Sequence, residues 1–189
     1  MTPPYDDTVI AYTSDHGDAC GSHGLRAKLP CVYEEVMGVP LIMKVPGVTQ
    51  AGTETDALAT HVDLATTLCA LGGVDIDDAP TLSGVDLSPA LADPSASPRD
   101  YVFFSQDAAQ SDLIANTRYA VRGFFDGETK YARYYGIGGG VDRAGNVDER
   151  PKLFGEEAAF EDHDHEWYEP ANDPHELINL ANDVGRKGE

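Results

Sequence analysis

One stretch, Thr8 to Pro40, constrains the fold of this 189-residue chain more than any other part of the sequence. It begins with an apolar run at residues 9–12, which is short, continuous and rich in residues that favour β-structure. Such a run is typical of a strand buried on both faces of a parallel sheet. We therefore expect a strand over residues 8–14, followed by a loop over residues 15–35.

The predicted strand leads directly into Asp15, His16 and Gly17. In open α/β sheets, ligands bind beyond the carboxyl ends of the strands. A carboxylate beside an imidazole, followed by a glycine that lets the backbone turn sharply, suits a metal site at such a place. Taken alone, the three residues favour the simpler interpretation, a turn capped by Asp15 with His16 as a solvated loop residue.

The loop that follows carries cationic or potentially cationic side chains at His23, Arg26 and Lys28. Cationic groups beside a bound metal ion are what an anionic ester substrate requires, because they stabilise charge on the ester oxygens. Arg26 is the one of the three that we expect at the surface without a role in the site.

Beyond the loop, turn residues and apolar spacing predict the remaining elements. In the first half we expect a second buried strand over 36–46, a helix from about Asp56 to Leu71 ended by Gly72-Gly73, and a short helix near Leu87–Leu91. In the second half we expect β-segments at 101–104, 119–122 and 131–134, a hairpin turn at Asp126-Gly127, a glycine-rich loop over 136–150, and a final helix near 174–182. The acidic tract at 161–165, with His163 and His165, is interpreted as solvated.

In combination, these motifs resemble the sulfatase family of the alkaline-phosphatase superfamily, in particular its arylsulfatase-like members. The matching motifs in the first half are S-D-H-G at Ser14–Gly17, Lys28, Y-E-E at Tyr33–Glu35, V-P-L-I at 39–42 and H-V-D-L-A-T-T-L at 61–68. Those in the second half are R-Y-A-V-R at 118–122, Lys130-Tyr131, and W-Y-E-P at 167–170 with the stretch 172–181. The resemblance implies an α/β fold of the alkaline-phosphatase type, represented by its C-terminal portion only. It assigns 1–99 to the large domain, with half the metal site, and 100–189 to a small antiparallel β C-terminal subdomain with a closing helix.

The resemblance also implies roles for four residues. Asp15 and His16 match metal ligands, and hard oxygen ligands favour Ca²⁺ as the divalent cation, with Mn²⁺ or Mg²⁺ as alternatives. Lys28 matches the lysine that contacts the sulfate, which makes it a catalytic and substrate-binding candidate. His23 is a second such candidate, able to orient the substrate or donate a proton to the leaving group, and a purely structural role for it remains equally open.

Three further residues resemble supporting positions of the family. Asp63 resembles a position that caps a helix, so we expect it, with His61, to be structural. Glu34 is expected to support the loop and to hold Lys28 in place.

The nucleophile of the family is absent from these residues. Sulfatases use a cysteine or serine in C/S-x-P-x-R, oxidised to formylglycine, and no such motif occurs in the 189 residues. Neither Cys20 nor Cys31 lies in that context. We therefore expect the formylglycine and the paired aspartates of the metal site in an N-terminal half, which would be a partner of this chain. Alone, the chain is expected to be inactive and unstable, with an unpaired strand edge and exposed apolar surface.

The implied activity of the intact enzyme is hydrolysis of a small-molecule sulfate ester. A phosphonate or phosphate monoester hydrolase of the same superfamily is the first alternative, because such enzymes share the D-H-G motif and the metal site. Phosphoethanolamine transferases of the superfamily typically carry a histidine where Lys28 stands, so Lys28 favours sulfatase-like hydrolysis. A non-catalytic remnant that binds an anion or a partner is another alternative, as is a split enzyme completed by a second chain.

Composition limits the partners and the compartment. A formal net charge of −20 excludes nucleic acid and anionic membrane surfaces as favourable partners. The same charge, spread along the chain, suggests a salt-adapted protein. The sequence contains no run of about 18 apolar residues, so we expect no membrane-spanning helix. The first seven residues do not resemble a signal peptide, which predicts a cytoplasmic protein if Met1 is the true start. Three cysteines without C-x-x-C predict no disulfide framework.

Overall fold

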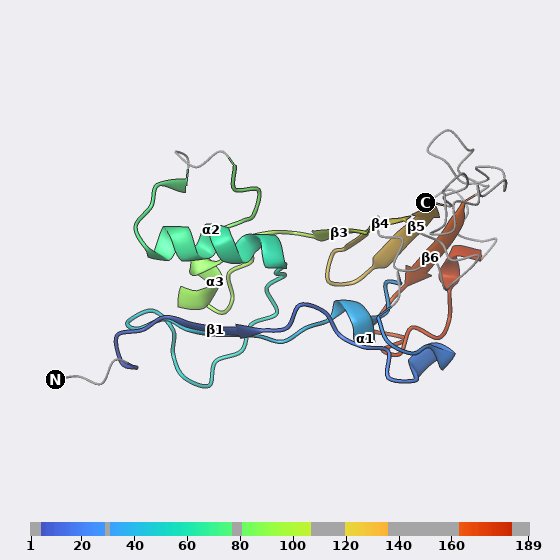
Figure 1. Cartoon of the computed structure of the whole chain (residues 1–189), viewed down its shortest axis with the longest axis horizontal. Coiled ribbons are helices and arrows are strands. Elements are labelled where there is room, and N and C mark those ends of the chain that lie inside the picture. The colour runs from blue at the N-terminus through green and yellow to red at the C-terminus, as the bar shows by residue number, and fades with distance from the viewer. Residues whose placement is uncertain (1–4, 29–30, 77–80, 107–119, 136–162, 183–189) are drawn as a thin grey trace, which may run out of the picture. The chain divides into compact units, whose positions relative to one another are not determined.

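A computed structural model describes residues 5–28, 31–76, 81–106, 120–135 and 163–182 (Figure 1). The glycine-rich loop expected over 136–150 and the segment Arg118-Tyr119 lie outside the described residues. The chain divides into two compact units, one formed by Met1–Asp15 with Pro40–Val102, the other by His16–Val39 with Phe103–Glu189. The domain division expected at residue 99 stays a prediction, since contact-based units need not be independent domains.

The first unit contains a two-stranded ribbon, in which β1 (Ile10–Thr13) pairs antiparallel with β2 (Leu41–Lys44). Ile10 faces Lys44 across the pair and Thr13 faces Leu41. Both strands occur where the sequence predicts them, but the expectation of a parallel, doubly buried arrangement is wrong for the described residues. Among these, β1 has β2 as its neighbour in the sheet, and three of the four positions of β1 and two of the four positions of β2 are exposed.

Helix α2 (His61–Leu71) is the main helix of the first unit, and it begins five residues later than predicted. Its start is set by a capping box, in which the Thr60 side chain accepts from the backbone N–H of Asp63 and the Asp63 side chain accepts from that of Thr60. Its buried side chains are Asp63, Thr66 and Thr67, whereas Val62 and Leu68 are 53% and 45% exposed. The helix therefore buries a polar face among the described residues and leaves apolar side chains outside.

Two of these buried side chains, Asp63 and Thr67, bond to the segment that leads into the short helix α3 (Ser88–Ala92). Thr67 Oγ1 accepts from the backbone N–H of Leu87 at 2.9 Å, and Asp63 Oδ1 accepts from that of Val85 at 2.8 Å. The Arg99 guanidinium forms an ion pair with the same carboxylate, which is fully buried. Figure 1 shows α3 lying directly beneath α2. The structural role expected for Asp63 is thus confirmed.

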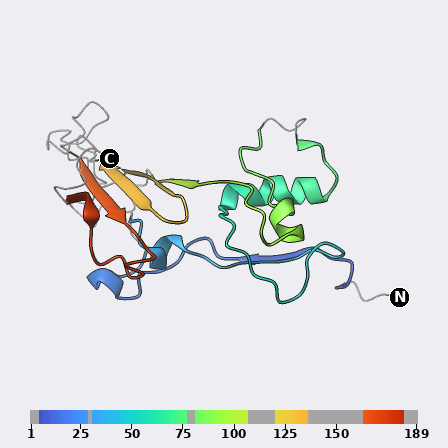
Figure 2. The same cartoon turned by 180° about the vertical axis from the view of Figure 1, so that it is seen from behind.

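The second unit is built on a four-stranded sheet in the order β3-β4-β5-β6, visible from both sides in Figures 1 and 2. Its strands are β3 (Val102–Gln106), β4 (Ala120–Phe125), β5 (Lys130–Tyr135) and β6 (Asp164–Tyr168). The predicted hairpin is confirmed: β4 and β5 pair antiparallel around a turn in which Gly127 has φ 94°. The expected small antiparallel sheet is therefore present.

One face of this sheet forms the core of the second unit. The buried cluster comprises Val32, Val121, Ala132, Tyr134 and Tyr168, against which Tyr33 and Phe104 pack. The Tyr134 hydroxyl donates to Glu166 Oε2 at 2.7 Å, and burial raises the pKa of this tyrosine well above its ordinary value. Because Val32 and Tyr33 belong to the cluster, the core anchors the end of the loop that begins at His16.

Two expectations for the C-terminal region are wrong. The tract around His163 and His165 is not merely solvated: β6 begins at Asp164, Arg133 donates to His163 Nδ1 at 2.7 Å, and the Tyr131 hydroxyl lies 2.7 Å from His165 Nδ1. The final helix is reduced to a 3-10 turn, η4 (Leu180–Asn182), because the preceding residues form turns stabilised by side chains such as Asp173 and Asn179. Among the described residues, no helix is long and apolar enough to cross a membrane.

Candidate functional site

Strand β1 is followed directly by Ser14 and Asp15, after which the chain passes from the first unit into the second at His16. The Asp15 carboxylate is exposed. The imidazole Nε2 of His61, the first residue of α2, lies 2.7 Å from the Ser14 carbonyl oxygen and donates to it. His61 thus fixes the backbone directly before Asp15, a structural role that agrees with the sequence-based expectation.

His16 is half-buried at the start of the second unit, and its two ring nitrogens have different partners. Nδ1 lies 2.7 Å from the carbonyl oxygen of Gly17, which can only accept, so Nδ1 carries the proton. Nε2 is then the nitrogen with the lone pair, and it faces Lys28 Nζ at 2.8 Å. A carbonyl that fixes the tautomer and leaves Nε2 as the electron-pair donor is the arrangement found behind metal-bound histidines.

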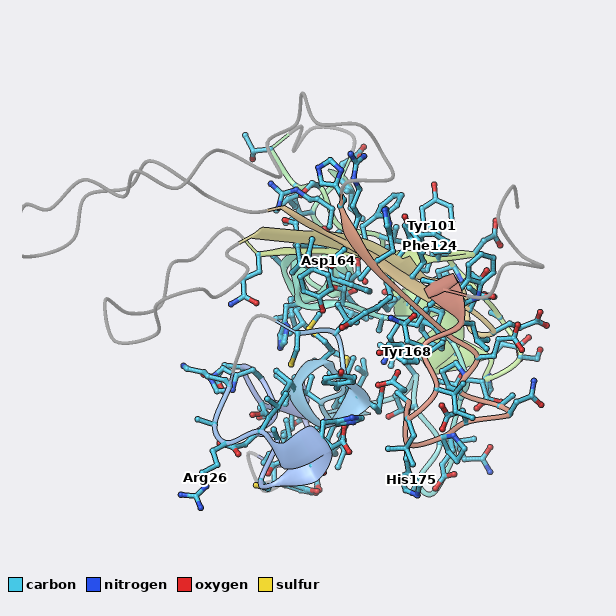
Figure 3. All side chains as sticks on the ribbon, turned by 90° about the vertical axis from the view of Figure 1, so that its right-hand side faces the viewer. Arg26, Tyr101, Phe124, Asp164, Tyr168 and His175 are labelled. Atoms are coloured by element: carbon cyan, nitrogen blue, oxygen red, sulfur yellow. The ribbon has the colours of Figure 1, made fainter. Side chains whose placement is uncertain are left out.

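Lys28 and Arg26 lie close in sequence but differ in their surroundings. Lys28 lies twelve residues beyond His16, and the loop turns back so that its ammonium contacts the imidazole. Arg26 is exposed, and Figure 3 shows its side chain extending away from the ribbon into solvent. The structure thus brings Lys28 and His16 together and leaves Arg26 at the surface, as expected.

Gly17 is required by a close approach to a short helix, α1 (Glu34–Met37). Its backbone N–H donates to the Val36 carbonyl oxygen at 2.9 Å, and a Cβ atom at Gly17 would lie 1.9 Å from the Glu35 carbonyl oxygen. Gly17 is not among the glycines with positive φ. The residue is therefore needed for proximity, whereas the sequence suggested a sharp turn.

His23 occupies η1 (Ser22–Gly24), where its backbone has a positive φ of 54°. Its ring stacks on Tyr33, with 3.6 Å between ring centroids and an interplanar angle of 8°. Its Nε2 lies 3.6 Å from Glu35 Oε2, and only 11% of the side chain is exposed. The pKa of Glu35 is lowered, first by its own backbone amide and further by Ser22 and His23. His23 is thus held firmly at one edge of α1.

The expectation that Glu34 holds Lys28 in place is wrong, because Glu34 pairs with a different lysine. Its carboxylate Oε2 lies 3.0 Å from Nζ of Lys130, the first residue of β5, and Lys28 contacts His16 instead. Lys130 also pairs with Glu176 at 2.6 Å. The sequence offered a weak signal for this cluster, because Lys130 and Glu176 both fall in the motifs quoted above without an assigned role.

The donor set fits part of a metal site. Among the residues that the structure describes, no group of three or more His, Cys, Asp or Glu side chains is arranged to hold an ion. His16 and Asp15 offer the right atoms for two ligands, a neutral imidazole nitrogen and carboxylate oxygens, and divalent cations require more. Their role as metal ligands therefore stays a prediction.

Comparison with known proteins shows what the chain resembles. Residues 2–74 match the family model described as Sulfatase. An N-acetylglucosamine-6-O-sulfatase from Bacteroides thetaiotaomicron is 35% identical over 96 residues, or 51% of this chain. Arylsulfatase K from Mus musculus is 27% identical over 175 residues, or 92% of this chain. The chain is similar in sequence to sulfatases. It spans 17% of the length of the first of these sulfatases and 27% of the second.

Solved structures confirm the alkaline-phosphatase-like fold expected for a sulfatase. A 2-O GAG sulfatase superposes with a TM-score of 0.68 and 26% identity, covering 98% of this chain and 34% of that protein. A protein solved with its substrate D-glucosamine-2-N,6-O-disulfate gives a TM-score of 0.70 at 24% identity, covering 95% of this chain and 31% of that one. The phosphonate monoester hydrolase of Agrobacterium radiobacter gives 0.64 at 24% identity, covering 96% and 32%.

Proposed function

We propose that this chain supplies part of the active centre of a metal-dependent hydrolase of sulfate esters. The observation that carries the proposal is the 2.8 Å contact between Lys28 Nζ and His16 Nε2. It brings a cation suited to an anionic substrate to the very nitrogen that suits a metal ion. The sulfatase relatives support sulfate as the anion, since one is an N-acetylglucosamine-6-O-sulfatase and another a Δ4,5-hexuronate-2-O-sulfatase.

In this proposal Asp15 and His16 hold a divalent cation, with Ca²⁺ favoured and Mn²⁺ or Mg²⁺ as alternatives. The bound cation would polarise the sulfuryl oxygens of the ester. His16 contributes through Nε2, because the Gly17 carbonyl keeps the proton on Nδ1. Lys28 donates to the same Nε2 lone pair, so the ammonium and a metal ion compete for that nitrogen. If Nε2 held a metal ion, the Lys28 ammonium would be available to bind the ester oxygens.

Lys28 is proposed to bind the sulfate and to stabilise negative charge that develops on it. His23 is the second candidate for substrate contact or proton transfer. Its ring is largely covered by the Tyr33 stack, and Nε2 faces Glu35, so we propose that it acts from a fixed position at the rim of the site. The formylglycine nucleophile must come from outside these 189 residues, since they contain no C/S-x-P-x-R.

The test begins with the DNA upstream of the Met1 codon. We expect it to encode C/S-x-P-x-R and a pair of metal-binding aspartates, in this frame or a shifted one. The joined protein should hydrolyse nitrophenyl sulfate in the presence of a divalent cation. Lys28→Met should lower kcat/KM by about 10²–10³-fold, the effect typical of losing one transition-state donor. Arg26→Met is the matched control and should retain activity, because Arg26 extends into solvent.

Two outcomes would contradict the proposal. If the upstream DNA encodes no such motifs, the non-catalytic remnant that binds an anion or partner becomes the better account. If the joined protein turns over nitrophenyl phosphate or phosphonate far faster than nitrophenyl sulfate, the alternative hydrolase class applies. Structural likeness to a phosphonate monoester hydrolase makes that second assay necessary.

A further inference from the structure

Three distant segments of the second unit meet at a buried ion cluster, formed by Glu34, Lys130 and Glu176. Lys130 Nζ lies 2.6 Å from Glu176 Oε1 and 3.0 Å from Glu34 Oε2. The side chains of Lys130 and Glu176 are 3% and 1% exposed, whereas that of Glu34 is 64% exposed. Glu176 Oε2 also accepts a hydrogen bond from the backbone N–H of Glu34 at 2.7 Å. One buried carboxylate thus binds both the first residue of α1 and the first residue of β5.

Glu176 adopts a backbone conformation that costs free energy. Its φ is +50°, in the left-handed region that residues with a Cβ atom seldom occupy. Such strain persists only where surrounding contacts over-determine the conformation, and it concentrates at functional positions. The contacts that hold Glu176 include the two from its carboxylate oxygens to Lys130 and to the start of α1, and a hydrogen bond from its backbone N–H to the Asp173 carbonyl oxygen at 3.0 Å.

From α1 the contacts continue to the candidate site. The carbonyl of Val36 accepts from the backbone N–H of Gly17, the residue directly after His16. Glu35 faces His23, and Tyr33, the residue before the helix, stacks on the same ring. The missing Cβ of Gly17 lets the two backbones touch. Each link from Lys130 to the neighbours of His16 is therefore a direct contact.

We propose that Lys130 and Glu176 are positioning residues for the candidate site. They fix α1 in one place, and α1 fixes the backbone after His16 and the ring of His23. A displaced helix would deprive Glu176 of the backbone N–H of Glu34 and Lys130 of the Glu34 carboxylate, and the loss of a hydrogen-bond partner is costly for a buried charged group. The assignment of His16 and His23 to an active site rests on the proposed function, but the mechanical link through α1 does not.

The link can be measured on the full 189-residue chain without any enzymatic assay. We would record hydrogen exchange of the Gly17 amide and the NMR shifts of the His23 ring, which stacking on Tyr33 moves upfield. In Lys130→Met, we expect the Gly17 amide to lose its protection and the His23 ring signals to move toward those of an unstacked histidine. Arg99→Met is the matched control, because it removes the cation of the buried Asp63 pair in the other unit. It should lower stability while leaving both signals unchanged.

A milder variant keeps the proposal falsifiable if Lys130→Met does not fold. Glu34→Gln removes one charge from an exposed side chain, and we expect the same two signals to move in the same direction by a smaller amount. Unchanged Gly17 and His23 signals in a folded Lys130→Met chain, or in Glu34→Gln, would overturn the proposal. So would equal changes in Arg99→Met, since the signals would then report general loosening.

An activity assay separates this proposal from the proposed function. In the joined enzyme, Lys130→Met should lower kcat with little change in KM, because Lys28 still binds the sulfate while the site is misaligned. If the joined enzyme has no sulfatase activity yet the NMR signals respond as expected, the proposed function fails and the positioning role stands. If wild-type activity is present and Lys130→Met retains full kcat, the positioning role fails.

Discussion

At the residue scale, close backbone approach and buried charge determine which positions tolerate change. Gly17, in the Asp-His-Gly motif, shows how the reason for a residue can differ from the one its sequence suggests. The motif predicted a metal-site loop in which the glycine allows a sharp turn. In the structure the glycine is needed because its backbone lies directly against the backbone of α1, where a Cβ atom would not fit. A sequence cannot distinguish these reasons, since glycine serves turns and close approaches equally.

Gly17→Ala is expected to be destabilising. The added Cβ would lie 1.9 Å from the Glu35 carbonyl oxygen, and backbone atoms cannot move aside as a flexible side chain can. We expect a loss of about 1–3 kcal/mol in the free energy of unfolding, as for other overpacked positions. Urea denaturation measures it. At Gly24, by contrast, nothing lies within 4 Å of an added Cβ, and the cost of Gly24→Ala would come from its φ of +71° rather than from a clash. An unchanged stability of Gly17→Ala would contradict the structure.

Asp63→Ala is expected to cost more than any surface change in the first unit. The substitution removes the capping-box carboxylate of α2 and leaves the Arg99 guanidinium without its buried partner. Breaking a buried pair in this way costs about 3–5 kcal/mol. Thr60→Ala, which removes only the hydroxyl half of the box, should cost about 1 kcal/mol. Denaturation midpoints of the two variants would test this order, and a smaller effect for Asp63→Ala would refute it.

At the element scale, sequence signals predicted an element correctly where residues within a few positions of one another determine the backbone conformation. Asp126-Gly127 specified the hairpin, and the β-rich runs specified β1 and β2, because these signals act within a few residues. Strand β6 was missed because its start, rich in charged and histidine residues, lacks β-formers, and its pairing with β5 is a long-range choice. The closing helix predicted near 174–182 is wrong because local side-chain contacts favour turns: Asp173, for example, accepts from the backbone N–H of Ile178.

The β4–β5 turn supplies a pH-dependent prediction. The backbone N–H groups of Thr129 and Glu128 donate to Asp126 Oδ1 at 2.6 and 2.9 Å, and they lower the pKa of this carboxyl below its ordinary value of 3.8. A lowered pKa in the folded state means that the ionised carboxylate stabilises the hairpin above pH 3.8, and this contribution is lost as the pH falls through the folded-state pKa.

Asp126→Asn should remove this acid-dependent part of stability. Compared with the wild type, the variant should be slightly less stable at neutral pH, and the difference should vanish well below pH 3.8. Urea titrations across this pH range measure the difference. Glu128→Gln is the control, because only the backbone of Glu128 serves the turn. A difference that persists unchanged at low pH would show that the carboxylate charge is not the cause.

At the scale of the whole molecule, charge and exposed apolar surface act on all elements together. The likeness to sulfatases could be predicted from ordered motifs, and the two candidate metal ligands stay a prediction. The antiparallel pairing of β1 with β2 and the polar buried face of α2 could not, because both depend on which segments are near in space. Apolar side chains such as Tyr12 and Ile42, 62% and 63% exposed, confirm the expected exposed apolar surface.

The net charge of −20 predicts a strong response to salt. Self-repulsion in a compact acidic chain weakens as the Debye length falls from about 10 Å at 0.1 M to about 3 Å at 1 M salt. We expect the thermal midpoint to rise steadily between these KCl concentrations. Sucrose at matched osmolality provides the control for excluded-solute effects. An unchanged midpoint in KCl would exclude salt adaptation.

The hydrogen bond from Glu34 to Glu176 also has a consequence for the order of synthesis. It joins positions 142 residues apart, so the ribosome makes the partner of α1 long after the helix itself. Until then, the loop around His16 has all its own side chains but lacks the carboxylate that fixes its supporting helix. A premature stop codon shortly after Tyr168 would therefore yield a chain that contains every candidate site residue and still leaves them unaligned.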